Sequence, residues 1–389
     1  MKFVAFSIFL LINASLRCNA SDDTKISIDF GALFHEDNFP SPRFNKFSKQ
    51  TRAKNYPPLS EFHYPISKSV DTVTMLRHDT NAISVVDDQN DIELKHSVAE
   101  LIESVGGLPD HPSENKNAAY WGKLEKVREM REITIANLER PAKKILTNIM
   151  QLPKRWKDYT MNDVAEAVHD EYPGQHQAEF IFDLLNGKYG RVQIDDTIIP
   201  RRARAQFLHG IVMLADLNTW SVSNVGPYNF GAKWFAGRAR PEEVAWKIKT
   251  GELEMAPQWI KSKIDKFPDF TSPEKFTNYQ EGSPRHPSWP AMHSAASNIS
   301  FWIQIVMRLT PNQLCEAKKV DYAVAYARTI AGVHFEDDNI AGLDMGQEIV
   351  GRDLPGYIES KYGTDAERIE RKMENKRFKW EYYDPLEAC

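Results

Sequence analysis

Cysteine is scarce in this chain of 389 residues, which contains only three. A framework of several disulfides is therefore excluded as a source of stability. Cys315 and Cys389 remain once the first twenty residues are set aside, and they can pair with each other, pair across subunits or stay free. The chain also lacks runs of alternating β-branched residues and any repeat of fixed period, which argues against sheet and repeat architectures.

An excess of positive charge and long internal apolar runs are absent as well. The formal net charge is −5, or −7 once Lys2 and Arg17 are removed with an N-terminal leader. A mildly acidic chain favours neither nucleic acid nor an anionic membrane as a partner. The most apolar internal stretches, 207–217 and 301–309, are too short to span a bilayer and contain polar residues.

The first twenty residues have the pattern of a secretory signal. Lys2 is followed by the apolar run "FVAFSIFLLINASL" and then by the small or polar residues of "CNA", which end at Ala20. We therefore expect cleavage after Ala20 and a secreted, extracellular protein. Residues 21–95, rich in Asp, Asn, Ser, Pro and Lys, are predicted to form an irregular N-terminal arm.

From residue 96 to the end, the spacing of apolar residues is typical of helices. The predicted helices cover 118–150 with a break near Pro141, 162–172, 175–187, 201–224, 291–309 and 313–351 with an interruption at Gly332. An irregular stretch is expected after residue 224, with a new helix starting at Pro241. The prediction is an all-α fold of helical bundles over 96–389, with an irregular N-terminal region.

Three segments combine residues of distinctive chemistry. They contain Lys233 and Arg240-Pro241; His286 and Pro290-Ala291-Met292-His293; and Arg328, His334 and Asp338. Taken singly, each has an ordinary interpretation as surface cations, a residue near a helix start or a hydrogen-bonded pair. Three converging cations would repel one another, however, unless they surround a multiply charged oxyanion that guanidinium groups can grip.

The joint pattern K-x6-R-P, P-x-x-H and R-x5-H-x3-D resembles the signature shared by vanadium-dependent haloperoxidases and type-2 acid phosphatases. The segment "GVHFEDDNIAG" at 332–342 is similar to its counterpart in the haloperoxidases, and in particular the bromoperoxidases. The resemblance implies a haloperoxidase-like fold with two four-helix-bundle halves. It lies within 230–345, and the first two hundred residues contribute nothing to it.

The resemblance also implies a role for each matched residue. The oxyanion of one vanadate per chain would be bound by Lys233, Arg240, Arg328 and the backbone N–H of Met292, and Lys233 would also act in catalysis by polarising the peroxide. His334 would coordinate vanadium, with Asp338 behind its ring, and His293 would be the acid–base group. His286 would lie on the halide side, because the algal bromoperoxidases carry His at this position and the fungal chloroperoxidases carry Phe.

The implied activity is oxidation of bromide or iodide by hydrogen peroxide to hypohalous acid, which halogenates an organic acceptor. One alternative is a secreted type-2 acid phosphatase, in which His334 attacks phosphorus and His293 protonates the leaving group. Another is a non-catalytic protein on a decayed scaffold. Chain length, the signal and residues 332–342 favour the peroxidase, while the oligomeric state, including a homo-oligomer, stays open.

One departure from the family pattern concerns the two residues before His293. Ala291-Met292 stands where the family usually has Ser-Gly. The missing hydroxyl is predicted to weaken anion binding by about 1.5–3 kcal/mol, the range for hydrogen bonds to charged groups. Met292 is also expected to narrow the pocket, and we expect weakened or altered cofactor affinity rather than an inactive protein.

Overall fold

The computed structural model describes residues 96–110, 112, 118–140, 152–154, 156, 159–164, 174–195, 206–279, 282–284 and 286–385, without the side chains of 206–209 and 234. Over these residues the protein is all-α, as predicted. The expected signal at 1–20 and arm at 21–95 lie outside them. Cys315 is disulfide-bonded, so it is not a free thiol. Among the described helices, none combines the length and the apolar character that a membrane span requires.

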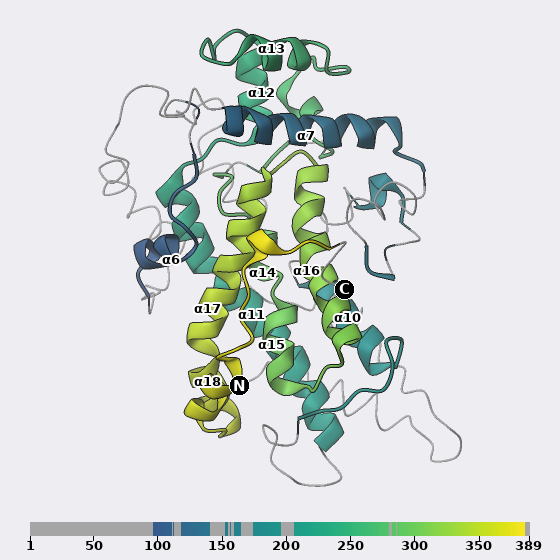
Figure 1. The fold of residues 1–389 in the computed structure, drawn as a ribbon, viewed down its shortest axis with the longest axis vertical. Coiled ribbons are helices and arrows are strands. Elements are labelled where there is room, and N and C mark those ends of the chain that lie inside the picture. Colours follow the sequence, from purple (N-terminus) through teal and green to yellow (C-terminus); the bar gives the residue numbers. More distant parts are fainter. Residues whose placement is uncertain are drawn as a thin grey trace, which may run out of the picture.

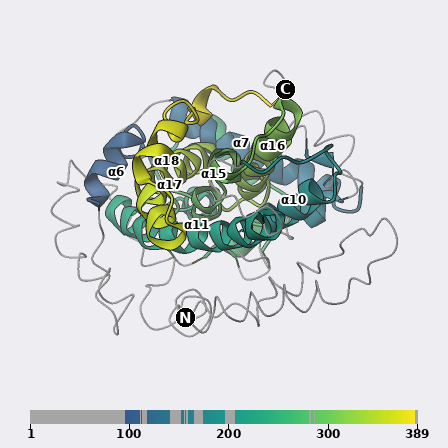
Figure 2. The same ribbon diagram turned by 90° about the horizontal axis from the view of Figure 1, so that it is seen from below.

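A bundle of roughly parallel and antiparallel helices forms the body of the molecule (Figure 1). Its members are α10 (Gln175–Leu185), α11 (Gln206–Ala236), α14 (Met292–Ala296), α15 (Ile299–Val306), α16 (Pro311–Ile330) and α17 (Glu336–Tyr362). Seen along its length, α15 lies in the middle of the bundle (Figure 2). Seven of the eight residues of α15 are buried, so it forms the centre of the apolar core.

The remaining helices cover the ends and flanks of this bundle (Figure 1). Across one end lies α7 (Ala118–Ala136), with α12 (Pro241–Lys249), α13 (Gln258–Asp265) and the 3₁₀ turn η5 (Pro273–Phe276) around it. On the flank of α17 are α6 (Val98–Ser104), α18 (Ala366–Met373) and the turn η6 (Trp380–Tyr382). The candidate residues lie where the bundle meets α7 and α12.

Helix α11 extends beyond the predicted end at residue 224. The expected irregular stretch is helical as far as Ala236, although Pro227 lies inside it and cannot donate a backbone hydrogen bond. Val225, Tyr228 and Ala232 are buried in the core, and this burial offsets the lost hydrogen bond. The longer helix places Lys233 in its last turn, facing the interior.

The helix predicted over 291–309 is interrupted, which corrects the sequence interpretation. Two short helices, α14 and α15, are separated at Ser297-Asn298. The buried carboxylate of Asp321, from α16, accepts hydrogen bonds from Ser297 Oγ at 2.9 Å and from the backbone N of Ser300 at 2.8 Å. This carboxylate therefore caps α15 and ends α14 only three residues after His293.

The connection between α16 and α17 follows the prediction. α16 ends at Ile330, and Gly332 adopts a positive φ of 81° that a non-glycine residue rarely accepts. α17 then starts at Glu336. As a result, Arg328 and His334, at the end of one helix and just before the next, are held on either side of a tight turn.

Candidate active site

Most of the predicted site residues converge at one buried location between α11, α14, α16 and α17. Lys233, Arg240, Arg328, His334 and Asp338 are all less than 5% exposed. Long cationic side chains are rarely buried to this extent without a partner. The sequence spacing thus identified side chains that the fold brings together.

Lys233 donates from Nζ to the backbone oxygens of Pro287 at 3.1 Å and Ser288 at 2.9 Å. Burial lowers the pKa of Lys233 well below its ordinary value, and the neighbouring charge of Arg240 acts in the same direction. An ammonium group has three donors. When protonated, Lys233 has one N–H beyond these two hydrogen bonds, which a bound anion can accept.

Arg240 joins the loop that contains His286 to the turn that contains His334. Its Nη1 donates to the Val333 oxygen at 2.8 Å and lies 3.1 Å from His334 Nε2. Its Nε donates to the His286 oxygen at 3.0 Å, and its Nη2 lies 3.1 Å from His286 Nδ1. Burial lowers the pKa of Arg240 to about 10. Arg240 nevertheless stays charged at neutral pH.

These contacts define the protonation state of His334. A guanidinium group can only donate, so His334 Nε2 must accept from Arg240 and carries a lone pair. The ring proton is then on Nδ1, which lies 3.2 Å from Asp338 Oδ2. Burial, followed by the charges of Arg240 and Lys233, lowers the pKa of His334 well below its ordinary value. His334 is therefore neutral, with its Nε2 lone pair facing the cations.

Asp338 holds His334 and is itself held by residues that the sequence analysis did not single out. Arg238 Nη1 donates to Asp338 Oδ1 at 2.7 Å, and Ser288 Oγ donates to Asp338 Oδ2 at 2.5 Å. The backbone N of Phe335 donates to the same Oδ2 at 2.9 Å. The only sequence signal for Arg238 was its place two residues before Arg240.

Arg328 contacts a further residue that motif spacing did not identify. Its Nη1 donates to the Tyr279 hydroxyl at 2.5 Å. Tyr279 is almost fully buried and also lies near Arg240. Tyr279 belongs to none of the three motif segments, so motif spacing could not assign it.

His293 and Met292 form the first turn of α14, next to the start of α17. The backbone N of Ala291 donates to the backbone oxygen of Asp338 at 2.9 Å, which anchors this end of α14 beside the site. His293 is partly exposed. The Met292 side chain packs against Val222 in a small apolar cluster. The contribution of the Met292 backbone N–H to anion binding stays a prediction.

His286 lies against the cations rather than away from them. Its ring packs edge-to-face on Phe230, with 5.2 Å between the ring centroids. Burial, then the charges of Arg240 and Lys233, lowers the pKa of His286 well below its ordinary value. Its Nδ1 lies 3.1 Å from Arg240 Nη2 and 3.3 Å from the backbone oxygen of Pro287.

Buried cationic and carboxyl groups lie together in this cluster. Arg238 is paired with Asp338 and with the partly exposed Asp337, at 2.7 and 2.9 Å. The buried carboxyl of Glu242 lies near Arg240, and burial raises the pKa of Glu242. Burial and the charge of Arg240 lower the pKa of Lys233. A bound anion would favour the charged form of the Lys233 side chain.

The donor set fits an oxyanion and not a caged metal cation. Within the described residues, no three or more His, Cys, Asp and Glu side chains are grouped so as to hold a metal ion. The cluster instead offers several cationic N–H donors and one imidazole lone pair, on His334 Nε2. Vanadate needs such a set, because cations bind its oxygens while an imidazole coordinates the metal.

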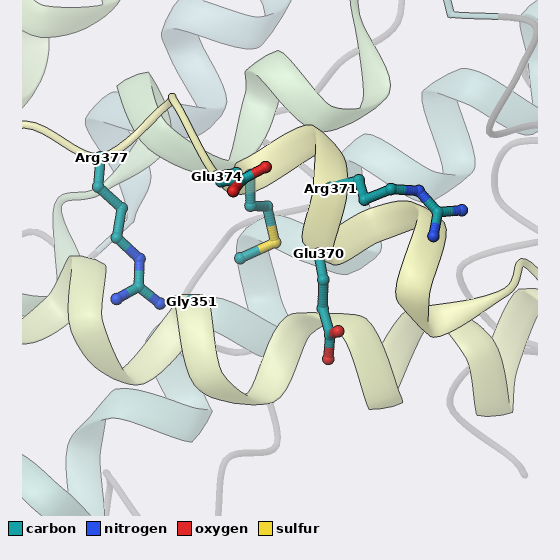
Figure 3. Close-up of a pocket in the computed structure, with 6 residues that line it drawn as sticks. Gly351, Glu370, Arg371, Glu374 and Arg377 are labelled. Atoms are coloured by element: carbon teal, nitrogen blue, oxygen red, sulfur yellow. The ribbon is translucent and has the colours of Figure 1, made fainter.

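A surface recess between α17 and α18 lies apart from this cluster. It is lined by Gly351, Glu370, Arg371, Met373, Glu374 and Arg377 (Figure 3). Along the axis of α17, Gly351 lies about 20 Å beyond Asp338. The Arg377 guanidinium lies over Gly351, where a Cβ atom would overlap it, and pairs with Glu348. The recess therefore belongs to the packing of the C-terminal segment on α17.

Neither models of known families nor curated proteins match this chain. The functional argument therefore depends on the chemistry of the cluster itself.

Proposed function

We propose that this protein is a secreted, vanadate-dependent haloperoxidase. It would oxidise bromide or iodide with hydrogen peroxide to hypohalous acid, which then halogenates an organic acceptor. The observation that carries the proposal is the neutral His334, whose Nε2 lone pair faces buried Arg240 beside Lys233 and Arg328. A lone pair beside cationic donors suits an oxyanion whose central atom also bonds to His334 Nε2.

The cofactor would be one vanadate per chain, with its oxygens on Lys233, Arg240 and Arg328 and its metal on His334. When bound, vanadate supplies a Lewis acid that activates peroxide without changing its own oxidation state. Arg240 Nη1 donates to the lone pair of His334 Nε2 in this structure. If that lone pair bonded to vanadium instead, Nη1 would donate to an oxygen of the anion. The contacts of Arg240 with the His286 and Val333 carbonyls keep the guanidinium in place.

The proton-transfer role belongs to His293. It is a partly exposed imidazole in the first turn of α14, whereas His334 is buried and tied to Asp338. A partly exposed imidazole can exchange protons with water, as an acid–base group requires. Phe230 and His286, also partly exposed, lie together on the same side as Met292 and support a halide-side face.

The same neutral His334 also supports the second candidate, a type-2 acid phosphatase. An unprotonated Nε2 is a competent nucleophile toward phosphorus. The motif segment at 332–342 and the length of the chain favour the peroxidase.

The two functions are separated by one series of assays on the purified protein. The protein is incubated with orthovanadate, supplied with peroxide and bromide, iodide or chloride, and halogenation of a dye is followed. A haloperoxidase gains activity with vanadate and loses it to competing phosphate. A phosphatase hydrolyses phosphate esters and is inhibited by vanadate. Absence of both activities would favour the non-catalytic alternative and contradict the proposal.

A further inference from the structure

Tyr279 brings a buried hydroxyl group to the cationic side chains of the candidate site. The residue is 3% exposed, and its ring belongs to an apolar cluster that includes Ile330 and Val333. The hydroxyl oxygen accepts a hydrogen bond of 2.5 Å from Arg328 Nη1. Tyr279 also lies near Arg240. The phenol is therefore placed beside two of the three cations that the proposed oxyanion would contact.

The backbone around Tyr279 is fixed to the turn that connects α16 to α17. The backbone N of Asn278 donates to the Ala331 oxygen at 2.9 Å. Thr277 Oγ1 donates to the backbone oxygen of Tyr279 at 3.0 Å and accepts from the backbone N of the same residue at 3.2 Å. Arg328 lies in the last turn of α16, close to this connection. The hydroxyl and the guanidinium are thus held together by the backbone, which lowers the cost of ordering them around a ligand.

The contact with Arg328 leaves the hydrogen of the Tyr279 hydroxyl for another acceptor. A guanidinium group can only donate, so the phenol oxygen is the acceptor in this contact. A phenol also has one O–H to donate, and its acceptor must be a group other than Arg328. An anion that contacts Arg328 and Arg240 brings oxygen atoms, which are strong acceptors, to this part of the cluster.

We propose that Tyr279 is an oxyanion-binding residue, whose hydroxyl donates to the bound anion while it accepts from Arg328. The hydrogen bond from the guanidinium polarises the phenol and makes its O–H a stronger donor. The inference deepens the proposed function and rests on it only because both require an oxyanion in this cluster. The ligand class is a tetrahedral oxyanion, for which inorganic phosphate serves as the probe.

The variant Tyr279→Phe removes the hydroxyl and keeps the ring in the apolar cluster. Titration calorimetry of the purified, anion-free protein with inorganic phosphate should show an affinity at least about tenfold lower, since a hydrogen bond to a charged group is lost. The matched control is Tyr326→Phe. Tyr326 is also buried and precedes Arg328 on α16, but its ring stacks on Tyr322. The control should bind phosphate as the wild type does.

A second substitution separates donation to the anion from mere positioning of Arg328. Replacement of Tyr279 by 3-fluorotyrosine makes the hydroxyl more acidic, so it donates more strongly and accepts more weakly. If the hydroxyl donates to the anion, phosphate affinity should rise about twofold or more. If the hydroxyl only accepts from Arg328, phosphate affinity should fall or stay unchanged. The same replacement at Tyr326 is the control and should leave phosphate affinity unchanged.

The inference is overturned if the wild type does not bind phosphate, if Tyr279→Phe binds it as tightly as Tyr326→Phe, or if fluorination at Tyr279 fails to tighten binding. Thermal unfolding shows whether each variant is folded, and the fluorinated protein decides the matter if Tyr279→Phe is not.

Failure of the proposed function has a different signature. A protein without vanadate-dependent halogenation can still bind phosphate through Tyr279, because the titrations contain neither vanadate nor peroxide. An active haloperoxidase whose phosphate affinity does not depend on Tyr279 would overturn this inference and leave the proposed function standing.

Discussion

At the scale of the residue, the site consists of two imidazoles, His334 and His286, beside buried cationic side chains. Burying an ammonium or guanidinium group costs several kcal/mol unless it is compensated. Lys233 recovers part of this cost from the carbonyls of Pro287 and Ser288, and Arg328 from Tyr279. The convergence of these buried cationic side chains is the physical reason to expect an anionic ligand here.

The two histidines should separate binding from turnover. His293→Ala should retain vanadate and lose bromide oxidation, since His293 is assigned to proton transfer, where such groups contribute about 10²–10⁴-fold in rate. His334→Ala should lose vanadate itself. Metal analysis after gel filtration, combined with the dye assay, distinguishes the two. Equal vanadium contents in the two variants would contradict these roles.

Residue types and their joint spacing were enough to predict Lys233, Arg240, Arg328, His334 and Asp338 as a group, because converging cations point to one shared anion. Arg238 and Tyr279 were not predicted. Their contacts with Asp338 and Arg328 join segments that are 100 and 49 residues apart. The lowered pKa of His286 was also beyond the sequence, since it depends on burial and on the cations that the fold places beside the ring.

At the scale of the element, the contact of α14 with α17 decides where His293 lies. Gly342 and Gly346 face the backbone of α14, and a Cβ atom on either would overlap the carbonyl oxygen of Ala291 or Ala295. These two glycines therefore allow α14 to approach α17 with no side chain between the backbones.

Gly346→Ala should push α14 away from α17 and destabilise the protein by about 1–3 kcal/mol, as overpacking of a core does. Gly356→Ala is the control on the same helix. Gly356 has open space at its Cβ position, so alanine should be neutral or stabilise by up to about 1 kcal/mol. Chemical denaturation measures both. A Gly346→Ala protein as stable as the Gly356→Ala protein would show that the close packing is unimportant.

Asp321, which separates α14 from α15, makes stability depend on pH. Burial raises the pKa of Asp321 from 3.8 to about 6. Between these values the folded state binds the proton more tightly, so stability falls as pH rises through this window, by about 3 kcal/mol in total. Asp321→Asn does not titrate and should lack this loss.

The measurement is the unfolding free energy of wild type and Asp321→Asn at pH 4 and at pH 7. The variant should gain on the wild type by about 2.4 kcal/mol between the two pH values. A difference that does not change with pH would mean that the carboxylate titrates near its ordinary value.

Elements were predicted well where the local pattern is decisive and poorly where a distant residue intervenes. The start of α17 after Gly332 followed from the interruption in the sequence. The break at Ser297 depends on Asp321, more than twenty residues away, and could not be seen locally. The extension of α11 past Pro227 depends likewise on the core that buries Val225 and Tyr228.

At the scale of the whole molecule, the buried cluster around His334 lies at one end of the helical bundle, near α7 and α12 (Figure 1). The ion pairs of Lys123 with Asp337 at 2.8 Å and Lys126 with Glu336 at 2.6 Å join α7 to the start of α17. The apolar core of α15 lies further along the same bundle. The site thus depends on several helices at once.

Secretion is tested on the whole chain. Expression of the full-length protein in a secreting host should release a product that begins at Ser21, because the predicted signal ends at Ala20. Mass spectrometry of the N-terminal peptide reads this directly. A product retained inside the cell, with Met1 or Phe3 still present, would contradict the proposed location.

The most direct test of the central claim is the equilibrium binding of orthovanadate to the purified, anion-free protein. The account predicts one vanadate per chain, displaced by phosphate and lost in His334→Ala, because the lone pair on His334 Nε2 and the cations around it form the site. Absence of binding, or binding that persists unchanged in His334→Ala, would contradict it.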